Sequence, residues 1–395
     1  MKLAILGSTG SIGASALRVV ERHPDRFQVV ALAAHRNVAA LAGQAARYGA
    51  SIVAVGDAEA TLPRSNGVQW TRGEAAVETL ASLPDVDTVL NAVMGAAGLR
   101  ATLAALRAGK RLALANKESL VAAGPLVMRA LREGGGELIP VDSEHSAILQ
   151  CLRGCARSDA DASAEVRDLA AASYPEVRRL VVTASGGPFR AWPHERIAAA
   201  TRADALRHPT WSMGAKITVD SATLVNKALE VMEAHWLFGL DYDAIDVVVH
   251  PQSIVHSMVE FIDGSVVSQM GFPTMELPIL YALTHPDRLP DAGTRFDPLA
   301  ASPLTFEPVD HGRFPAFGLG LAAGRAGGTA PAAFNAANEE AVAAFLADRL
   351  PFSGVTQTID AVLQAHDTRA VDSLDDVLEA DRSAREAARR HIEAC

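Results

Sequence analysis

Short apolar runs alternate with amphipathic, helix-forming stretches along the first 150 residues. The apolar runs lie at 2–6, 28–33, 52–55, 88–91, 111–115 and 137–141. Runs of this length beside turn residues are typical of buried strands, and strands that alternate with helices build a parallel sheet. The pattern therefore predicts an N-terminal α/β domain at 1–150 with a Rossmann-like, doubly wound sheet.

The pattern changes after residue 150. Further strands are expected at 180–184, 247–250, 254–261 and 265–270, the last two joined at the hairpin signal Asp263-Gly264. They predict an α+β catalytic domain whose open sheet is a candidate dimerisation surface. This gives a catalytic domain at 151–285, a proline-rich linker at 286–311 and a C-terminal helical bundle at 312–395, with its strongest helix at 332–346.

The first apolar run leads directly into a glycine turn, Gly7-Ser8-Thr9-Gly10-Ser11-Ile12-Gly13, and a helix is expected at 14–22. Strand, glycine turn and helix follow one another in this order in dinucleotide-binding folds. The G-x-x-G-x-x-G spacing departs from the usual G-x-G-x-x-G, and a tight structural turn is the alternative. The position of the turn after the first strand favours a cofactor site, with the pyrophosphate at the helix N-terminus.

The end of the second strand indicates which nicotinamide cofactor is bound. An NAD-specific fold has an acidic residue there for the ribose 2′-hydroxyl, whereas this chain reads Ala34-His35-Arg36-Asn37. Arg36 is suited to a 2′-phosphate, so NADPH is favoured over NADH. The alternative for Arg36 is a solvated loop cation.

Polar residues follow two strands of the same sheet. Asn116, Lys117 and Glu118 come after the strand at 111–115, where ligand crevices of such sheets lie. Asp142 and Glu144 come after the strand at 137–141, and in extended backbone their carboxylates point to the same side. Such oxygen ligands suit Mg²⁺ or Mn²⁺. A solvated loop is the alternative, but Glu230 from the second domain would complete a three-carboxylate site.

The stretch from His208 to Glu230 combines a candidate lid with a polar helix face. Trp211, Met213 and Gly214 mix bulky and flexible residues, as a closing lid does. The capping types Asp220, Ser221 and Thr223 predict a helix that begins there and runs to Phe238. On that helix Asn226, Lys227 and Glu230 share one face, opposite the apolar residues Val225, Leu229, Met232 and Trp236. The alternative is a solvated Lys/Glu pair on an ordinary amphipathic helix.

Ser185, Gly186 and Gly187 follow the strand at 180–184 and can offer a hydroxyl and N–H groups to a phosphate; an ordinary turn is the alternative. His250 and His256 have no acidic partner nearby in sequence, so they are expected to be structural.

Composition limits the partners and the compartment. The net charge of −10 argues against nucleic acid or an anionic membrane as a general partner. The cysteines Cys151, Cys155 and Cys395 form no regular framework and lack a second ligand pair for zinc. With no signal-peptide pattern and no apolar run of membrane-spanning length, a cytoplasmic location is expected.

Seven motifs in collinear order resemble the 1-deoxy-D-xylulose 5-phosphate reductoisomerase family. They are GSTGSIG, LANKESL, VDSEHSAI, TASGGPF, HPTWSMGAKITVDSATLVNKALE, HPQSIVHSMV and NAANEEAVAAFL. Together they cover nearly the whole chain. The departures are His35 and Arg36, where many relatives have Gly-Lys, and the irregular segment at 151–176, which the motifs do not constrain.

The resemblance implies a cytoplasmic homodimer that converts 1-deoxy-D-xylulose 5-phosphate and NADPH to 2-C-methyl-D-erythritol 4-phosphate and NADP⁺. It implies one divalent ion, Mg²⁺ or Mn²⁺, on Asp142, Glu144 and Glu230. The residues implied in catalysis are Lys117, Asp142, Glu144, Glu230 and His208. Those implied at the substrate are Ser143, Ser185, His208, Trp211, Ser221, Asn226 and Lys227. Those implied at NADPH are Thr9, Gly10, Ser11, Ile12, Arg36, Asn37, Asn116, Glu118 and Gly214.

Two other functions compete with this one. An NADP-dependent semialdehyde dehydrogenase would use Cys151 as its nucleophile and need no divalent metal. An NADPH-sensing binding module would bind the cofactor without turnover and independently of Glu230.

Overall fold

The computed structural model describes residues 1–394 except 65–66, 154–167, 171–173, 291–292 and 294. Its first half contains a parallel sheet in the order β4-β3-β2-β1-β5-β6-β7. The strands are β1 (Lys2–Leu6), β2 (Gln28–Ala34), β3 (Ile52–Val55), β4 (Gln69–Arg72), β5 (Thr88–Asn91), β6 (Arg111–Leu114) and β7 (Glu137–Pro140). Because the order reverses between β1 and β5, the predicted doubly wound sheet is confirmed, and a ligand crevice is expected at that point.

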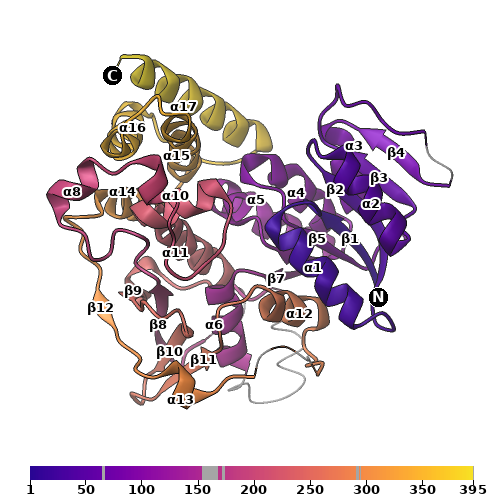
Figure 1. The fold of residues 1–395 in the computed structure, drawn as a ribbon, viewed down its shortest axis with the longest axis horizontal. Coiled ribbons are helices and arrows are strands. Elements are labelled where there is room, and N and C mark those ends of the chain that lie inside the picture. The colour runs from indigo at the N-terminus through magenta and orange to yellow at the C-terminus, as the bar shows by residue number, and fades with distance from the viewer. Residues whose placement is uncertain (65–66, 154–167, 171–173, 291–292, 294, 395) are drawn as a thin grey trace.

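Helices cover both faces of this sheet (Figure 1). They are α1 (Ser11–Arg22), α2 (Val38–Tyr48), α3 (Glu74–Ala81), α4 (Leu99–Arg107) and α5 (Lys117–Gly134), with the short 3₁₀ helix η1 (Gly95–Gly98) after β5. Apart from β4, the strands are mainly apolar and buried because the sheet is covered on both sides. Strand β4 was not predicted, since its Gln-Trp-Thr-Arg sequence belongs to a partly exposed edge strand.

The second sheet is mixed and has the order β11-β10-β8-β9-β12. Its strands are β8 (Val177–Ala184), β9 (Ile245–Val249), β10 (Val255–Phe261), β11 (Val266–Met270) and β12 (Glu307–Pro308). Helix α6 (Ser143–Arg153) runs from the end of β7 to this sheet, and packs against β10 and β11. Residues 286–311, expected as a plain linker, also contribute β12, which pairs with β9.

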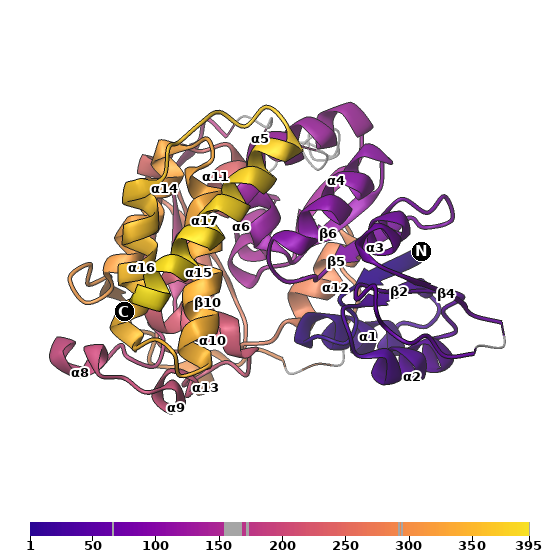
Figure 2. The ribbon, with the colours of Figure 1, turned by 90° about the horizontal axis from the view of Figure 1, so that it is seen from above.

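Shorter helices surround the second sheet and a helical bundle ends the chain. The shorter ones are α8 (His194–Ala198), α9 (Arg202–Ala205), η2 (Tyr242–Ala244), α12 (Glu276–Thr284) and α13 (Pro298–Ala301). The predicted bundle is present as α14 (Pro315–Ala326), α15 (Ala330–Leu346), α16 (Phe352–Ala365) and α17 (Leu374–Ala394). The bundle lies on the far side of α5 from strands β1–β4 (Figures 1 and 2). Among the described residues, no helix is both long and apolar enough to cross a membrane.

The helix expected to begin at Asp220 is in fact two helices, and this prediction was wrong. Helix α10 (Ala215–Thr223) begins earlier, so the presumed capping residues occupy its second half. Leu224 then adopts a left-handed conformation with φ of 59° and ends it. That conformation costs a leucine about 1–2 kcal/mol, and burial of its side chain to 2% exposure offsets the cost. Helix α11 (Val225–Phe238) therefore has its own N-terminus beside Asn226.

The apolar face predicted for this segment fixes α11 to the rest of the protein. Val225, Leu229 and Met232 are buried. Trp236 lies directly against Gly124 in α5, where an added Cβ would come 2.1 Å from the indole Cε2. Helix α5 is also kinked at this point, because Ala123 has φ of −141° and ψ of 31°. The two helices thus meet at a contact that only glycine permits.

Two of the three cysteines lie outside the described residues, and the third is buried. Cys155 and Cys395 lie outside the described residues, as does most of the irregular segment at 151–176. Cys151 is described and is buried in α6 with 3% exposure.

Candidate functional site

One pocket lies between the first sheet and the second, and it collects most of the candidate site residues. Its wall includes Ser11, Ile12, Lys117, Asp142, Ser143, Glu144, Ser185, His208, Trp211, Gly214, Ser221, Asn226, Lys227 and Glu230. These residues come from α1, α5, α6, the turn after β8, the segment before α10, and α10 and α11. The remaining candidates lie outside this wall and are Thr9, Gly10, Arg36, Asn37, Asn116 and Glu118.

Three carboxylates meet in the pocket. Asp142, Glu144 and Glu230 each offer an oxygen, and these atoms lie within 4.8 Å of one another. The expected extended backbone was wrong, because α6 begins at Ser143, whose N–H donates to Asp142 Oδ1 at 2.9 Å. Asp142 therefore sits at the start of α6 and Glu144 in its first turn. The helix geometry, not strand alternation, brings the two together.

Two lysines neutralise this cluster incompletely. Lys117 contacts Asp142 and, at 3.0 Å, Glu230. Lys227 contacts Glu230 and, at 2.7 Å, Glu144. Burial and repulsion by Glu144 raise the pKa of Glu230, although both lysines oppose this. Three carboxylates facing two ammonium groups leave one negative charge in a buried place, and hard oxygen donors there fit a divalent cation.

A buried pair behind the carboxylates was not found from the sequence. The Nε2 atom of His145 lies 2.8 Å from the backbone oxygen of Glu230, and its Nδ1 lies 3.4 Å from Glu233 Oε2. Both side chains are almost fully buried. The pair joins α6 to α11, the two helices that carry Glu144 and Glu230. Neither the sequence around His145 nor the helix that carries Glu233 gives a local signal of this contact.

The protonation of His208 follows from its neighbours. The backbone N–H groups of Thr210 and Trp211 both donate to His208 Nδ1, at 3.2 and 2.9 Å. The proton of the neutral ring is therefore on Nε2, which lies 2.9 Å from Ser185 Oγ and donates to it. Burial lowers the pKa of His208 to about 4, so the ring is neutral at pH 7.

Ser185 is consequently held as a donor toward the pocket. Its Oγ accepts from His208 and, at 3.2 Å, from the N–H of Gly187. With both bonds accepted, its own O–H remains available for an oxygen atom in the pocket. Gly187 has φ of 65°, and an added Cβ there would lie 2.5 Å from the backbone oxygen of Ser221. The turn after β8 thus packs closely on the end of α10.

His250 and His256, both expected to be structural, differ in whether they reach the pocket. His256 was expected to be structural, but it lines the pocket, and its ring lies 6.4 Å from that of Trp211. Strand β10 carries it there, a placement that depends on the pairing of strands. His250 has a structural role, since its Nδ1 lies 2.8 Å from Thr305 O and its Nε2 accepts from the N–H of Ile254.

The glycine turn leaves the N-terminus of α1 open to an anion. Gly7 has φ of 82°, and a Cβ on Gly13 would lie 2.4 Å from Gly7 O, so both positions require glycine. Gly10 precedes the helix and offers no capping side chain, and the first turn contains no acidic residue. The free N–H groups and the helix dipole there favour a bound anion.

Arg36 lies just after β2, at the carboxyl edge of the first sheet. Its side chain is 75% exposed, and its Nε is 3.2 Å from Asp57 Oδ2, just beyond β3. Asn37 caps α2, because its Oδ1 accepts from the N–H of Ala40. The contact with Asp57 was not predicted, since strand β3 and strand β2 become neighbours only in the folded sheet.

A doubly wound sheet with a bare helix N-terminus, and a carboxylate cluster in the adjoining pocket, place the chain among two-sheet α/β oxidoreductases. More specifically, it belongs to the 1-deoxy-D-xylulose 5-phosphate reductoisomerase family. The family model matches residues 3–124, and two models of its C-terminal domains match residues 138–238 and 270–387.

Individual relatives match over almost their whole length. A reductoisomerase from Gloeobacter violaceus is 50% identical over 99% of this chain and 97% of its own. One from Thermosynechococcus vestitus is 48% identical over 97% of this chain and 91% of its own.

Solved structures agree with this family. The Zymomonas mobilis reductoisomerase in complex with NADPH has a TM-score of 0.87 at 40% identity, covering 100% of this chain and 99% of that one. A reductoisomerase in complex with NADPH, fosmidomycin and magnesium has a TM-score of 0.89 at 37% identity, covering 100% and 98%.

Proposed function

We propose that this chain catalyses the NADPH-dependent isomerisation and reduction of 1-deoxy-D-xylulose 5-phosphate to 2-C-methyl-D-erythritol 4-phosphate, a step of isoprenoid biosynthesis. One observation carries the proposal. The first residues of α1, the three carboxylates and a set of phosphate-type donors all line a single pocket. A reaction that rearranges a sugar phosphate and then reduces the product needs these three kinds of group in one enclosed place.

Asp142, Glu144 and Glu230 would hold the divalent ion, Mg²⁺ or Mn²⁺. When bound there, such an ion supplies Lewis-acid stabilisation to oxygens of the substrate. The fit is supported by the oxygen-only donor set and by the negative charge that the two lysines leave uncompensated.

The nicotinamide cofactor, which supplies the hydride, fits the carboxyl edge of the first sheet. Ser11 and Ile12, at the open N-terminus of α1, also line the pocket, so a dinucleotide there reaches it. Arg36 is assigned to the 2′-phosphate. The other residues assigned to NADPH are Thr9, Gly10, Asn37, Asn116, Glu118 and Gly214.

The phosphate group of the substrate is assigned to the far wall of the pocket. The polar residues there are Ser185, His208, Ser221, Asn226 and Lys227, and His208 acts through Ser185, to which its N–H donates. Ser185 presents its O–H, as the bonds from His208 and Gly187 require. Lys227 carries a positive charge, because Glu144 and Glu230 outweigh the effect of burial and raise its pKa. Trp211 closes over the substrate as part of the lid.

Lys117 and Ser143 are assigned to the reacting carbons. Burial disfavours the Lys117 charge, but Asp142 and Glu230 outweigh it and raise the pKa of the ammonium group. Lys117 therefore stays a hydrogen-bond donor, and its Nζ also lies 3.1 Å from Asn226 Oδ1. Its three N–H groups are directed to Asp142, Glu230 and Asn226, so donation to a substrate oxygen on which negative charge develops would replace one of these bonds. Ser143 lies between two of the metal-binding carboxylates in sequence.

Cys151, the nucleophile that a semialdehyde dehydrogenase would need, is poorly placed for catalysis. Cys151 is buried in the core on α6 and is absent from the pocket wall. A buried thiol in apolar surroundings is inert.

We further propose the domain division 1–150, 151–285, 286–311 and 312–395, a cytoplasmic location and a homodimer formed through β11. This edge strand has an unpaired side and exposes Val266, Val267 and Met270. Sedimentation analysis should show a dimer in the wild type. Val266→Lys, with a charge on this edge, should shift the equilibrium toward monomer, whereas a dimer unchanged in Val266→Lys would place the interface elsewhere.

The test of the function is oxidation of NADPH by the purified protein with 1-deoxy-D-xylulose 5-phosphate, with and without Mg²⁺ or Mn²⁺. We expect turnover that needs the metal. NADPH bound by the folded protein without turnover would instead favour the binding-module function. Metal-independent turnover would contradict the assigned carboxylate site.

A sharper test concerns the carboxylates. Glu230→Gln should weaken Mg²⁺ or Mn²⁺ affinity by roughly tenfold or more, because it removes one charged ligand. Isothermal titration of the metal into the variant measures this directly. Glu133→Gln, an exposed glutamate in α5, is the matched control and should bind metal as the wild type does. Equal affinities in both variants would remove Glu230 from the metal site.

A further inference from the structure

Lysine is rare in this chain and concentrated at the pocket. Of 36 lysines and arginines, only Lys2, Lys110, Lys117, Lys216 and Lys227 are lysines. Lys117 and Lys227 contact the carboxylate cluster, whereas Lys216 has no role in the function proposed above. Lysine offers a compact point charge where arginine offers a broad planar fork. Because arginine predominates elsewhere in this chain, a lysine at position 216 suggests that this position needs the compact charge.

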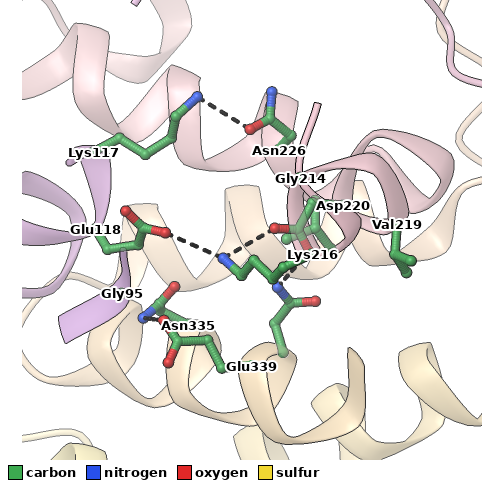
Figure 3. A network of polar contacts seen from close by, with 12 residues as sticks. Gly95, Lys117, Glu118, Gly214, Lys216, Val219, Asp220, Asn226, Asn335 and Glu339 are labelled. Atoms are coloured by element: carbon green, nitrogen blue, oxygen red, sulfur yellow. Dashed lines mark hydrogen bonds and ion pairs between the residues drawn. The ribbon is translucent and has the colours of Figure 1, made fainter. Parts of the chain in front are cut away.

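Lys216 connects two parts of the protein. It lies in the first turn of α10, two residues after Gly214. Its Nζ is 3.2 Å from Glu118 Oε1, at the start of α5, and 3.0 Å from Asp220 Oδ2, one turn along α10 (Figure 3). Ile217 and Ser221 face the pocket from the same helix. Helix α10 thus has one face toward the substrate and another fixed to the cofactor domain.

Glu118 is held on its other side as well. Asn116 Nδ2 donates to Glu118 Oε2 at 2.9 Å and to the backbone oxygen of Gly95 at 2.9 Å. Asn116 and Glu118 follow β6, and Gly95 follows β5, so they lie at the carboxyl edge where doubly wound sheets bind dinucleotides. Each oxygen of Glu118 accepts one bond from these neighbours and keeps a lone pair for a further donor.

The C-terminal bundle closes the junction (Figure 3). Asn338 Nδ2 donates to Asp220 Oδ1 at 2.8 Å. Glu339 packs against Gly95, where an added Cβ would lie 2.7 Å from Glu339 Oε1, and it pairs with Arg385 at 2.6 Å. Helix α15 therefore restrains both Asp220 and the segment that carries Gly95.

The charges make Lys216 the central member of this junction. Within the described ranges, no other cation makes an ion pair with Glu118 or Asp220. Asp220 is 1% exposed, and Glu118 is largely enclosed. Removing the ammonium group would leave two enclosed carboxylates without a cation, and they would repel each other or take up a proton.

We propose that Lys216 is a positioning residue that holds the Glu118 carboxylate for NADPH and fixes it to the helix that follows the lid. This rests on the proposed function, in which Glu118 contacts the cofactor. In wild-type protein, Lys216 and Asn116 orient the two oxygens of Glu118 before the cofactor arrives, so that binding needs little rearrangement. Because the same ammonium is part of α10, the cofactor site and the lid are mechanically joined.

The test is the affinity for NADPH, measured by the change in its fluorescence on binding. Lys216→Met should raise the Kd on the order of tenfold, the scale of one charge-assisted hydrogen bond. Lys110→Met is the matched control, since Lys110 donates to the backbone oxygens of Pro84 and Val86 in the N-terminal domain. It should leave the Kd unchanged. Mg²⁺ affinity should be the same in both variants.

A double-mutant cycle separates positioning from a general structural effect. If Lys216 acts through Glu118, Lys216→Met should change the NADPH Kd much less in a Glu118→Gln background than alone. Lys216→Arg keeps the charge and should fall between the wild type and Lys216→Met. Additive losses, or Lys216→Arg as weak as Lys216→Met, would overturn the proposal. Wild-type protein that binds no NADPH would instead contradict the proposed function itself.

Discussion

Single side chains in the pocket owe their chemistry to the hydrogen bonds that their neighbours make with them. Ser185 is a donor because His208 and a backbone N–H occupy its lone pairs, and His208 is a donor because two further N–H groups occupy its Nδ1. The chain of bonds runs from the lid segment to the turn after β8. A change in the lid backbone at Trp211 would therefore alter which atom of Ser185 faces the pocket.

Arg36 carries the prediction of cofactor choice. Its guanidinium is exposed and pairs with Asp57 only at the surface, so it is free to exchange this partner for a phosphate. Arg36→Glu should weaken NADPH binding by on the order of tenfold or more, because the lost contact is charge-assisted and the new carboxylate repels a phosphate. NADH binding should change much less. Kd values of both cofactors, measured side by side, check this, and equal losses would remove Arg36 from that role.

Many residues that line the pocket were predictable from short motifs, but their local geometry was not. Asp142 and Glu144 were expected to share a side of a strand, whereas a helix that begins between them brings them together. His256 was set aside because it has no acidic neighbour in sequence, yet strand pairing brings it to the pocket. Such placements depend on long-range packing, which no local pattern encodes.

Helices and strands were largely predictable because most carry a clear apolar period. Strands β3 and β5 have the expected bounds. The break at Leu224 was missed, since leucine is a good helix former and nothing local disfavours continuation. Its left-handed backbone is stabilised by burial among partners distant in sequence. The break matters, because it gives α11 its own N-terminus beside the proposed phosphate site.

The contact between helices α5 and α11, where Gly124 meets Trp236, can be tested directly. Gly124→Ala forces a Cβ to within 2.1 Å of the Trp236 ring, so we expect it to lower the free energy of unfolding by about 1–3 kcal/mol. Gly43→Ala, in α2 with nothing within 4 Å of the added atom, is the control and should be neutral or slightly stabilising. Urea unfolding compares them. Equal stability of the two variants would mean that Trp236 moves aside without cost.

At the scale of the whole molecule, buried histidines make stability depend on pH. Burial lowers the pKa of His208, His256 and His285 to about 4, against an ordinary 6.5. Between these values the unfolded chain binds protons that the folded chain does not. The free energy of unfolding should therefore fall as the pH is lowered from 6.5 toward 4.

His285 isolates one part of this effect. It is buried, and neither ring nitrogen has a hydrogen-bond partner in the part of the chain that the structure covers. His285→Phe should make the fall of unfolding free energy between pH 6.5 and 4 shallower, by up to about 1.4 kcal/mol per pH unit. His194→Phe, at an exposed position, should leave the slope unchanged. Urea unfolding at several pH values gives both slopes, and identical slopes would exclude His285 as a contributor.

The three carboxylates come from both sides of the pocket, and this has a thermodynamic consequence. Asp142 and Glu144 follow the last strand of the first sheet, and Glu230 belongs to α11. A cation held by all three would bind the folded protein and not the unfolded chain. By mass action it would raise the free energy of unfolding by about 2.7 kcal/mol at a concentration of 100 times its Kd. With a cation at the proposed site, free magnesium would be a variable that sets how firmly the two sides of the pocket stay together.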